Sequence, residues 1–306
     1  MAKIGLLDVD GHNFPNIPLM KISAYHKQMG DDVEWVMPIQ HYDKIYKSKI
    51  FSFTPDFEGI LQCDELFEGG SGYAIHLENG KEVYEKEKEG VLPKEIECQC
   101  PDYSLYPQFS EAYGFFVRGC PRGCPFCIVG KKEGRIARQV ADVDDFWKGQ
   151  KEIKLLDANL LACVDRERIL KSLADTKAYV DFTQGLDIRL TEGIVPLINQ
   201  IKVKRIHFAW DNAKQDLTRY FEEFKKYYKS KDYRRLGVYV LTNFDTTLEE
   251  DLYRVYKLRE LGFDPYVMIY NKSSAPRQIR LLQRYVNNRI IFRTVERFED
   301  YDEKRG

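Results

Sequence analysis

The sequence predicts an α/β protein in which a small open parallel sheet precedes an incomplete barrel of six β/α units. Three observations predict this fold. Short apolar runs alternate with amphipathic stretches, and a segment with two prolines at residues 100–109 interrupts the alternation. The 306-residue chain also leaves too little length after that segment for a closed eight-unit barrel, which typically needs ~250 residues. We therefore expect an N-terminal domain over residues 1–110 and a barrel with a C-terminal extension over residues 111–306.

The expected first sheet begins with the apolar run KIGLLDV at residues 3–9, which is typical of a buried strand. A helix should follow, because side chains recur at spacings of three and four, at Leu19, Ile22, His26 and Met29. Gly30 is its expected C-cap. Further strands are expected at residues 33–37, 49–53 and 65–70. Asn79-Gly80 then indicates a hairpin turn within the charged stretch 78–100.

The second part of the chain alternates more clearly. Apolar runs predict six strands, at residues 114–118, 153–156, 179–182, 205–210, 236–241 and 266–270. Helical stretches separate these runs, as at residues 216–228 and 248–261. Because the carboxyl ends of parallel strands meet at one edge, polar side chains just after these runs should share a site.

Composition limits the possible functions. The net charge of −1 does not call for a nucleic-acid or membrane partner, and 43% hydrophobic residues fit a globular chain. No stretch approaches the ~20 apolar residues of a membrane span, and the N-terminus does not have the pattern of a signal peptide. We therefore expect a cytoplasmic protein whose thiols stay reduced.

The most informative feature is the group of three cysteines Cys120, Cys124 and Cys127, out of seven in the chain. An odd number of cysteines in a reducing compartment favours metal-binding or reactive thiols over disulfides. Glycine and proline residues lie between the three cysteines, at Pro121, Gly123 and Pro125. Glycine lets the backbone fold closely and proline stiffens the turn, so this loop could direct three thiolates at one centre.

The number of thiols narrows the chemistry. A structural zinc site normally takes four protein ligands, and a redox dithiol needs two. Three thiolates on a [4Fe–4S] cluster leave the fourth iron free to chelate a small molecule, whereas a cluster that only carries electrons generally has every iron ligated by protein. Structural zinc and an electron-transfer cluster remain as alternatives at this point.

The run Cys120-Pro-Arg-Gly-Cys124-Pro-Phe126-Cys127 resembles the Cys-x3-Cys-x2-Cys signature of the radical SAM superfamily, which has an aromatic residue before the last cysteine. The resemblance extends over residues 110–275. It implies a [4Fe–4S] cluster whose open iron binds S-adenosylmethionine through its amino and carboxylate groups. It also implies reductive cleavage to methionine and a 5′-deoxyadenosyl radical, which takes a hydrogen atom from an unidentified substrate. An electron donor such as flavodoxin or ferredoxin would be a partner.

The resemblance also implies where S-adenosylmethionine would lie. Asp157 and Asn159, after the second strand, would accept from the methionine ammonium, unless they only cap a helix. The run QGLDIR supplies Gln184, Asp187 and Arg189. Arg189 would pair with the methionine carboxylate, the alternative being a surface pair between Asp187 and Arg189.

The later strand ends complete this expected site. Asp211 and Asn212 would bind the ribose hydroxyls, and Asn243 follows the fifth strand with Thr242 and Asp245 beside it. Phe126 would lie near the nucleoside. Tyr270 and Lys272, after the sixth strand, could face the substrate. Two further residues have structural explanations instead: His207 as a core histidine and Cys163 as an inert buried thiol.

The N-terminal region weakly resembles the cobalamin-binding-like domain that precedes the barrel in several radical SAM families, through KIGLLDVDG and FEGGSGY. His12 is a poor candidate cobalt ligand, because Pro15 stands where a glycine is expected, so cobalamin is not expected. A methylthiotransferase is disfavoured, since only Cys63, Cys98 and Cys100 precede the motif. Cys98 and Cys100 are too few for an auxiliary cluster.

Arginines recur near the C-terminus. They lie at helical spacing first and then continue along the chain, at Arg277, Arg280, Arg284, Arg289, Arg293 and Arg297. They could track nucleic-acid phosphates, although a solvated helix face also explains them. The alternatives to an enzyme with an unidentified substrate are therefore a non-catalytic iron–sulfur electron carrier or sensor, and an RNA-modifying radical SAM enzyme.

Overall fold

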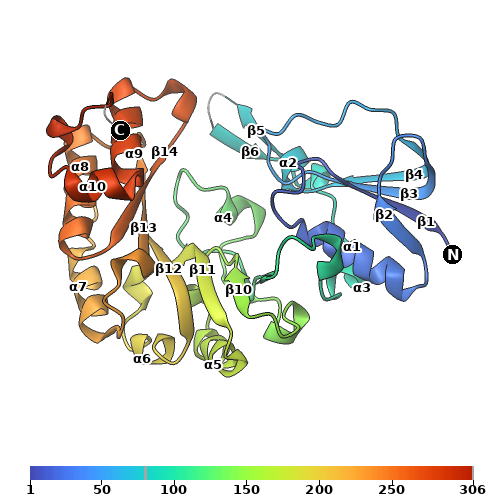
Figure 1. The fold of residues 1–306 in the computed structure, drawn as a ribbon, viewed down its shortest axis with the longest axis horizontal. Coiled ribbons are helices and arrows are strands. Elements are labelled where there is room, and N and C mark those ends of the chain that lie inside the picture. Colours follow the sequence, from blue (N-terminus) through green and yellow to red (C-terminus); the bar gives the residue numbers. More distant parts are fainter. Residues whose placement is uncertain (79–80, 305–306) are drawn as a thin grey trace.

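The computed structural model describes residues 1–78 and 81–304, which form a mixed α/β structure with two parallel sheets (Figure 1). The expected α/β class is confirmed. The smaller sheet has the order β2-β1-β3-β4, and all its neighbouring strands are parallel. Its elements are β1 (Lys3–Asp8), α1 (Ile17–Gln28), β2 (Asp32–Trp35), β3 (His41–Ser48) and β4 (Gln62–Gly69).

The expected strand at residues 49–53 is wrong, because the third strand, β3, ends at Ser48. The β3 sequence HYDKIYKS mixes charged and apolar residues although the strand is partly buried. It therefore contains no apolar run that would predict a strand. Lys47 is 7% exposed and forms ion pairs with Asp56 and Glu68, so its burial is compensated. Residues 49–53 form a loop at the carboxyl end of the sheet.

The segment after the first sheet contains short elements. β5 (Ile75–Glu78) and β6 (Lys81–Tyr84) pair antiparallel as the expected hairpin requires, but its Asn79-Gly80 turn lies outside the described residues. The short helices here are α2 (Ser71–Ala74) and α3 (Lys94–Glu97). The segment 100–109 then contacts both sheets: Tyr106 donates to Asp8 at the end of β1 across 2.7 Å, and the Tyr103 hydroxyl accepts from the backbone N–H of Tyr113, in the first strand of the larger sheet, across 3.0 Å. We propose the domain boundary near residue 110, at the end of this segment.

The larger sheet has six parallel strands in chain order, β14-β13-β12-β11-β10-β7. These are β7 (Ala112–Gly114), β10 (Glu152–Leu155), β11 (Tyr179–Leu186), β12 (Lys202–Ala209), β13 (Leu236–Thr242) and β14 (Asp264–Ile269). The intervening and following helices are α5 (Arg166–Thr176), α6 (Val195–Ile198), α7 (Thr218–Tyr227), α8 (Leu248–Glu260), α9 (Arg277–Asn287) and α10 (Arg289–Thr294). One face of the sheet forms the main core, where Phe208 packs against Phe221 and Phe224.

The expected strand at 114–118 is divided in the structure. β7 ends at Gly114, and β8 (Val117–Arg118) pairs antiparallel with β9 (Arg138–Gln139) in a separate small sheet. The division has a physical cause, since the buried carboxylate of Asp157 accepts from the backbone N–H groups of Phe116 and Val117, at 2.9 and 2.7 Å. The cysteine loop therefore starts from a short β-ribbon rather than directly from the large sheet.

The free edge of the large sheet is covered by side chains of α9. The backbone N–H of Val267 in β14 donates to Asn287 at 2.7 Å, and the Asn287 and Gln283 amides each donate to the Val267 carbonyl at 3.0 Å. Asn287 thus occupies the backbone groups that another strand would use. Among the residues that the structure describes, no helix has the length and apolar character needed to cross a membrane.

Candidate functional site

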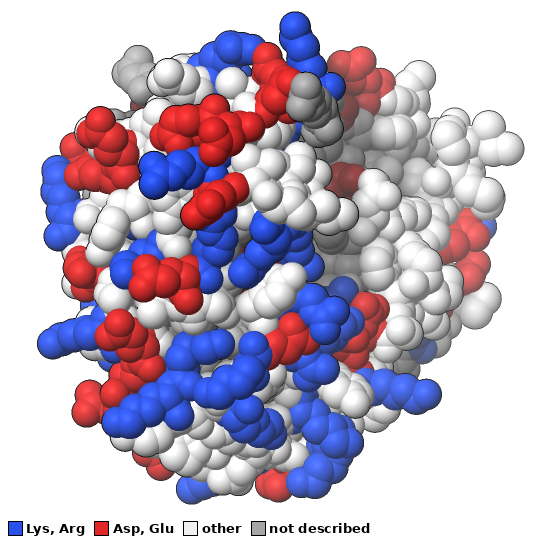
Figure 2. Space-filling view, turned by 60° about the vertical axis from the view of Figure 1, so that its left-hand side comes forward, with Lys and Arg blue, Asp and Glu red and all other residues white. Residues whose placement is uncertain are grey.

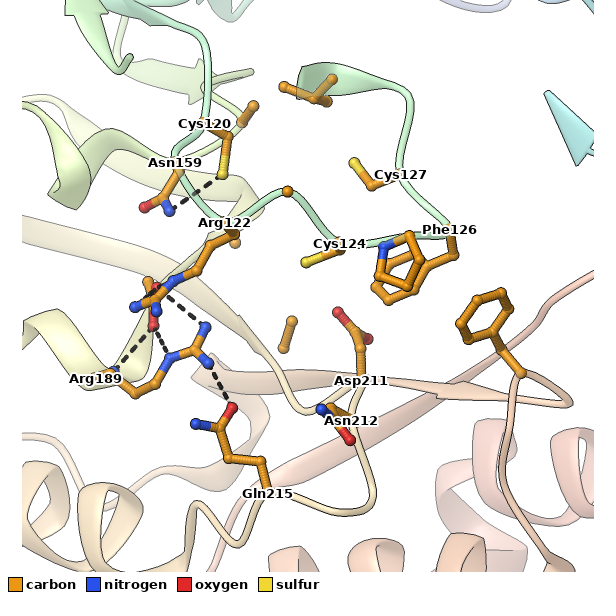
Figure 3. Close-up of a pocket in the computed structure, with 18 of the residues that line it drawn as sticks. Cys120, Arg122, Cys124, Phe126, Cys127, Asn159, Arg189, Asp211, Asn212 and Gln215 are labelled. Carbon is orange, nitrogen blue, oxygen red and sulfur yellow. Dashed lines mark hydrogen bonds and ion pairs between the residues drawn. The ribbon is translucent and has the colours of Figure 1, made fainter. Parts of the chain in front are cut away.

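A cavity of about 660 Å³ opens where the cysteine loop faces the carboxyl ends of β11 and β12 (Figure 3). Its lining brings together ten of the twelve side chains that the sequence predicts as metal or cofactor ligands: Cys120, Cys124, Phe126, Cys127, Asn159, Gln184, Asp187, Arg189, Asp211 and Asn212. The other two, Asp157 and Asn243, lie outside the lining. A cavity of this size suits a small organic ligand.

The cysteine loop presents three free thiols to this cavity. Gly119 and Gly123 have positive φ angles of 88° and 60°, a backbone geometry that favours glycine. A Cβ on Gly119 would lie 2.3 Å from the backbone carbonyl oxygen of Ile136, so the loop requires glycine at position 119 for space as well. Burial raises the pKa of the Cys124 and Cys127 thiols, and the neighbouring thiols raise it further. A metal cation bound by these thiols would instead lower their pKa.

Asn159 connects the cysteine loop to the end of β10. The side chain is 4% exposed, and its Nδ2 donates a hydrogen bond to the Cys120 Sγ across 3.5 Å (Figure 3). Its Oδ1 is fully buried and has no hydrogen-bond partner in the structure. Buried acceptors are normally hydrogen-bonded, so this oxygen is positioned to accept a hydrogen bond from a bound group.

Asp187 lies between two arginines at the cavity wall. Arg189 binds it in bidentate fashion, with Nε to Oδ1 at 2.7 Å and Nη2 to Oδ2 at 3.1 Å. Arg122, from the cysteine loop, forms an ion pair with the same carboxylate, and the remaining Arg189 Nη1 donates to Gln215 at 2.7 Å. The Asp187–Arg189 pair considered as the structural alternative is therefore formed, and the Arg189 fork is already occupied.

Asp211 and Asn212 follow β12 on the opposite wall of the cavity (Figure 3). Burial raises the pKa of Asp211 to about 6, with the backbone and the arginines Arg254 and Arg189 opposing that shift. Arg254 is fully buried beneath this loop and donates to the carbonyls of Trp210 and Leu241, at 2.6 and 2.9 Å. No local pattern predicts a buried arginine in α8, because Arg254 stands at an ordinary position of a helix that carries several other charged residues.

Aromatic side chains form a third wall. The rings of Phe126 and Phe244 meet edge to face at 5.3 Å between centroids, and Phe244 meets Tyr270 in the same way at 4.8 Å. Asn243 supports this wall from outside the cavity, because its Nδ2 donates to the Tyr270 carbonyl at 2.8 Å. Its φ of 63° turns the chain sharply after β13.

Asp157 is buried behind the site rather than in it. Its Oδ1 accepts the two backbone N–H groups described above, whereas its Oδ2 is buried without a hydrogen-bond partner. Burial raises the pKa of this carboxyl to about 7, against the lowering effect of the two backbone donors. Asp157 is therefore placed to shape the entry to the cysteine loop.

Sequence reasoning missed several residues of the cavity lining: Arg122, Lys214, Gln215 and Phe244. Arg122 stands between the first two cysteines, so its position inside the motif could have identified it. Phe244 directly follows Asn243 at a strand end, where an aromatic next to polar residues is a usable signal. Lys214 forms an ion pair with Asp245 at a distance of 2.5 Å, and Asp245 also lines the cavity.

Other nominated residues lie elsewhere. His207 and Cys163 are buried, and the His207 ring stacks on Tyr239 with 4.9 Å between centroids, in agreement with a core histidine. Burial lowers the pKa of His207 to about 4. The His12 ring stacks on Trp35 at 4.1 Å in the N-terminal region. The remaining cysteines Cys63, Cys98 and Cys100 are free thiols outside the cavity lining.

No protein-family model matches the chain, and no curated protein matches its sequence. Among solved structures, the chain is similar to the radical S-adenosylmethionine methyltransferase TsrM from Kitasatospora setae, solved with tryptophan substrate and the analogue aza-SAM bound. The identity is 9% and the TM-score 0.40, over 86% of this chain and 66% of that chain.

Proposed function

We propose that this chain is a radical SAM enzyme, with an incomplete (β/α)6 barrel built on the larger sheet. The observation that carries the proposal is the meeting of three free thiols, spaced Cys-x3-Cys-x2-Cys, with buried polar groups at one 660 Å³ cavity. When bound, a reduced [4Fe–4S] cluster would supply the electron that cleaves S-adenosylmethionine, and the resulting 5′-deoxyadenosyl radical would take hydrogen from the substrate.

The residues present fit such a cluster. Cys120, Cys124 and Cys127 would each ligate a different iron. Within residues 1–78 and 81–304, no three His, Cys, Asp or Glu side chains gather closely enough to hold a single metal ion, and a cubane does not need them to, because its ligand sulfurs bind separate irons. The buried Asn159 Oδ1, which has no partner in the structure, offers an acceptor for the methionine ammonium.

The other walls would orient the rest of S-adenosylmethionine. Asp211 and Asn212 would accept from the ribose hydroxyls, and Gln184 would add a neutral amide to the lining. The rings of Phe126 and Phe244 would pack on the adenine and exclude water. Because Asp187 and Gln215 already occupy Arg189, we propose that Arg189 positions the cysteine loop through Asp187 and Arg122.

Anaerobic reconstitution tests this function. After cluster assembly with iron and sulfide, dithionite and S-adenosylmethionine should give 5′-deoxyadenosine and methionine, without any added substrate. Cys124→Ala should abolish cluster binding and the products. Cys98→Ser is the matched control, since Cys98 is exposed outside the cavity lining, and it should keep both.

The competing function is an iron–sulfur electron carrier or sensor. A reconstituted cluster whose spectrum does not respond to S-adenosylmethionine, and which forms no 5′-deoxyadenosine, would support that function and overturn ours. Failure of the wild-type chain to bind any cluster would overturn both.

A further inference from the structure

A group of cations gathers at the amino ends of the last three strands of the larger sheet, away from the cavity. We call it the basic surface and define it by Lys202, Lys226, Lys229, Lys231, Arg234, Arg235, Arg289 and Arg293, all of them exposed. The segment 225–235, KKYYKSKDYRR, holds six Lys or Arg and one Asp, in a chain whose net charge is only −1. In Figure 2, which is turned by 60° from Figure 1, Lys and Arg side chains crowd the lower half of the visible face.

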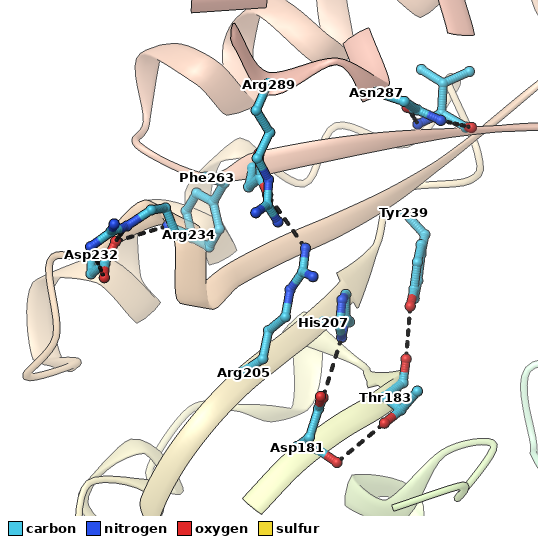
Figure 4. A network of polar contacts seen from close by, with 12 residues as sticks. Asp181, Thr183, Arg205, His207, Asp232, Arg234, Tyr239, Phe263, Asn287 and Arg289 are labelled. Carbon is cyan, nitrogen blue, oxygen red and sulfur yellow. Dashed lines mark hydrogen bonds and ion pairs between the residues drawn. The ribbon is translucent and has the colours of Figure 1, made fainter. Parts of the chain in front are cut away.

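Contacts hold these residues around the three strand ends. Arg235 donates to the carbonyl of Val203 in β12 across 3.3 Å. Arg293 donates to the Phe263 carbonyl across 3.0 Å, and its guanidinium lies 3.9 Å from the centre of the Tyr233 ring. The neighbouring charges Arg205 and Arg289 both pair with Asp264 at the start of β14 (Figure 4).

Most of this charge has no acidic partner. Lys226 lies 5.1 Å from the centre of the Tyr227 ring, Lys229 donates to the backbone carbonyl of Asn199, and Lys231 donates to the carbonyl of Lys225 at 2.7 Å. In the described part of the chain, none of these three lysines forms an ion pair. A single carboxylate, Asp232, forms ion pairs with both Arg234 and Arg235, and Figure 4 shows its pair with Arg234.

The arginines expected to track phosphates are divided by the structure. Arg277 forms an ion pair with Glu303, and Arg280 donates to the Ala275 carbonyl at 2.7 Å, so both serve internal contacts. Arg289 and Arg293, by contrast, belong to the basic surface. The positive charge that is free for a partner is therefore concentrated in the 225–235 segment, which the C-terminal pattern did not indicate.

We propose that the basic surface binds the phosphate backbone of a single-stranded nucleic acid. Exposed cations that lie close together in the sequence and form no ion pair can each contact a phosphate, and binding them releases counterions. Tyr227, 53% exposed among these cations, offers an aromatic face on which an unstacked base can lie. This partner goes beyond the proposed radical chemistry. Since a strand such as β12 has eight residues at ~3.3 Å each, the basic surface lies roughly 26 Å from the cavity end of the sheet.

Binding of a fluorescent 20-nucleotide RNA and of the DNA strand of the same sequence tests the proposal by anisotropy, from 50 to 200 mM salt. The triple variant Lys226→Gln, Lys229→Gln and Lys231→Gln should bind at least about tenfold more weakly. The plot of log binding constant against log salt concentration should also become less steep by about 2, since three phosphate contacts to a single strand contribute ~0.7 each. Equal affinity for both strands would identify the phosphate backbone as the ligand, and tighter RNA binding would add a contact to the 2′-hydroxyl.

The matched control removes three lysines of the N-terminal region, Lys44, Lys86 and Lys88, by the same change to Gln. It alters net charge equally and should bind like the wild type. No binding by the wild type at 50 mM salt, or equal losses in both triple variants, would overturn the proposal. Cluster assembly and formation of 5′-deoxyadenosine should be unchanged in both variants, so this test is independent of the radical SAM assignment.

Discussion

The Nδ2 of Asn159 donates a hydrogen bond to the Sγ of Cys120, and this bond joins the end of β10 to the first thiol of the cysteine loop. The donor is almost fully buried, so water cannot easily replace it. Hydrogen bonds to ligand sulfurs stabilise the more negative, reduced form of an iron–sulfur cluster and raise its reduction potential.

Removal of this donor should therefore lower the cluster potential. For Asn159→Leu we expect a midpoint potential about 40 mV more negative, equivalent to roughly 1 kcal/mol for one hydrogen bond in a one-electron couple. Potentiometric titration monitored by EPR measures it on the reconstituted protein. Gln184→Leu is the control, because Gln184 also lines the cavity but donates no hydrogen bond to a cysteine sulfur in the described structure. Equal midpoint potentials for the wild type and Asn159→Leu would contradict the proposal that the Asn159 hydrogen bond raises the cluster potential.

Asp157 should make the protein without cluster less stable as pH rises. Its folded-state pKa is raised from 3.8 to about 7, so the folded state binds the proton more tightly than the unfolded state. The free energy of unfolding should then fall as pH rises from about 4 to about 7, by up to ~4 kcal/mol at 1.36 kcal/mol per pKa unit. Urea unfolding at several pH values measures this dependence.

Asp157→Asn separates this effect from other titrations. An asparagine Oδ1 can still accept from Phe116 and Val117, but the side chain does not ionise. We expect the variant to be at least as stable as the wild type at pH 7.5 and to have a flatter profile between pH 4 and 7. A variant with the wild-type slope would show that Asp157 does not titrate in this range.

The buried pair of Arg254 and Asp251 should be essential for the loop that carries Asp211. Both side chains are at most 1% exposed, and Arg254 also binds the carbonyls of Trp210 and Leu241. Arg254→Met leaves a buried carboxylate and two carbonyls without donors, so we expect a loss of about 3–5 kcal/mol in the free energy of unfolding. Urea denaturation measures this loss.

Two further variants make that result specific. Lys257→Met changes a neighbouring helix position whose ion pair is with the exposed Glu260, and should cost under about 1 kcal/mol. Adding Asp251→Leu to Arg254→Met removes the stranded carboxylate and should recover part of the loss. A loss below about 1 kcal/mol in Arg254→Met would refute the structural role.

The large sheet was well predicted from local pattern. Five of its six expected strands fall on observed strands, because the apolar runs of β10 to β14 lie on a face packed under helices. Local pattern failed at β3, where Lys47 and Lys44 lie on a paired strand, and at residues 114–118. There, the carboxylate of Asp157, some 40 residues away, takes the backbone donors.

The order of residues alone sets the spacing of the three thiols and the polar residues that follow the parallel strands, because both are short-range features of the chain. Which side chains meet depends on the folded structure. It occupied Arg189 with Asp187, placed Asp157 behind the cavity, and gathered the cations of residues 225–235 with Arg289 and Arg293. Such contacts join residues tens of positions apart, and their energies depend on burial, which the order of residues along the chain does not specify.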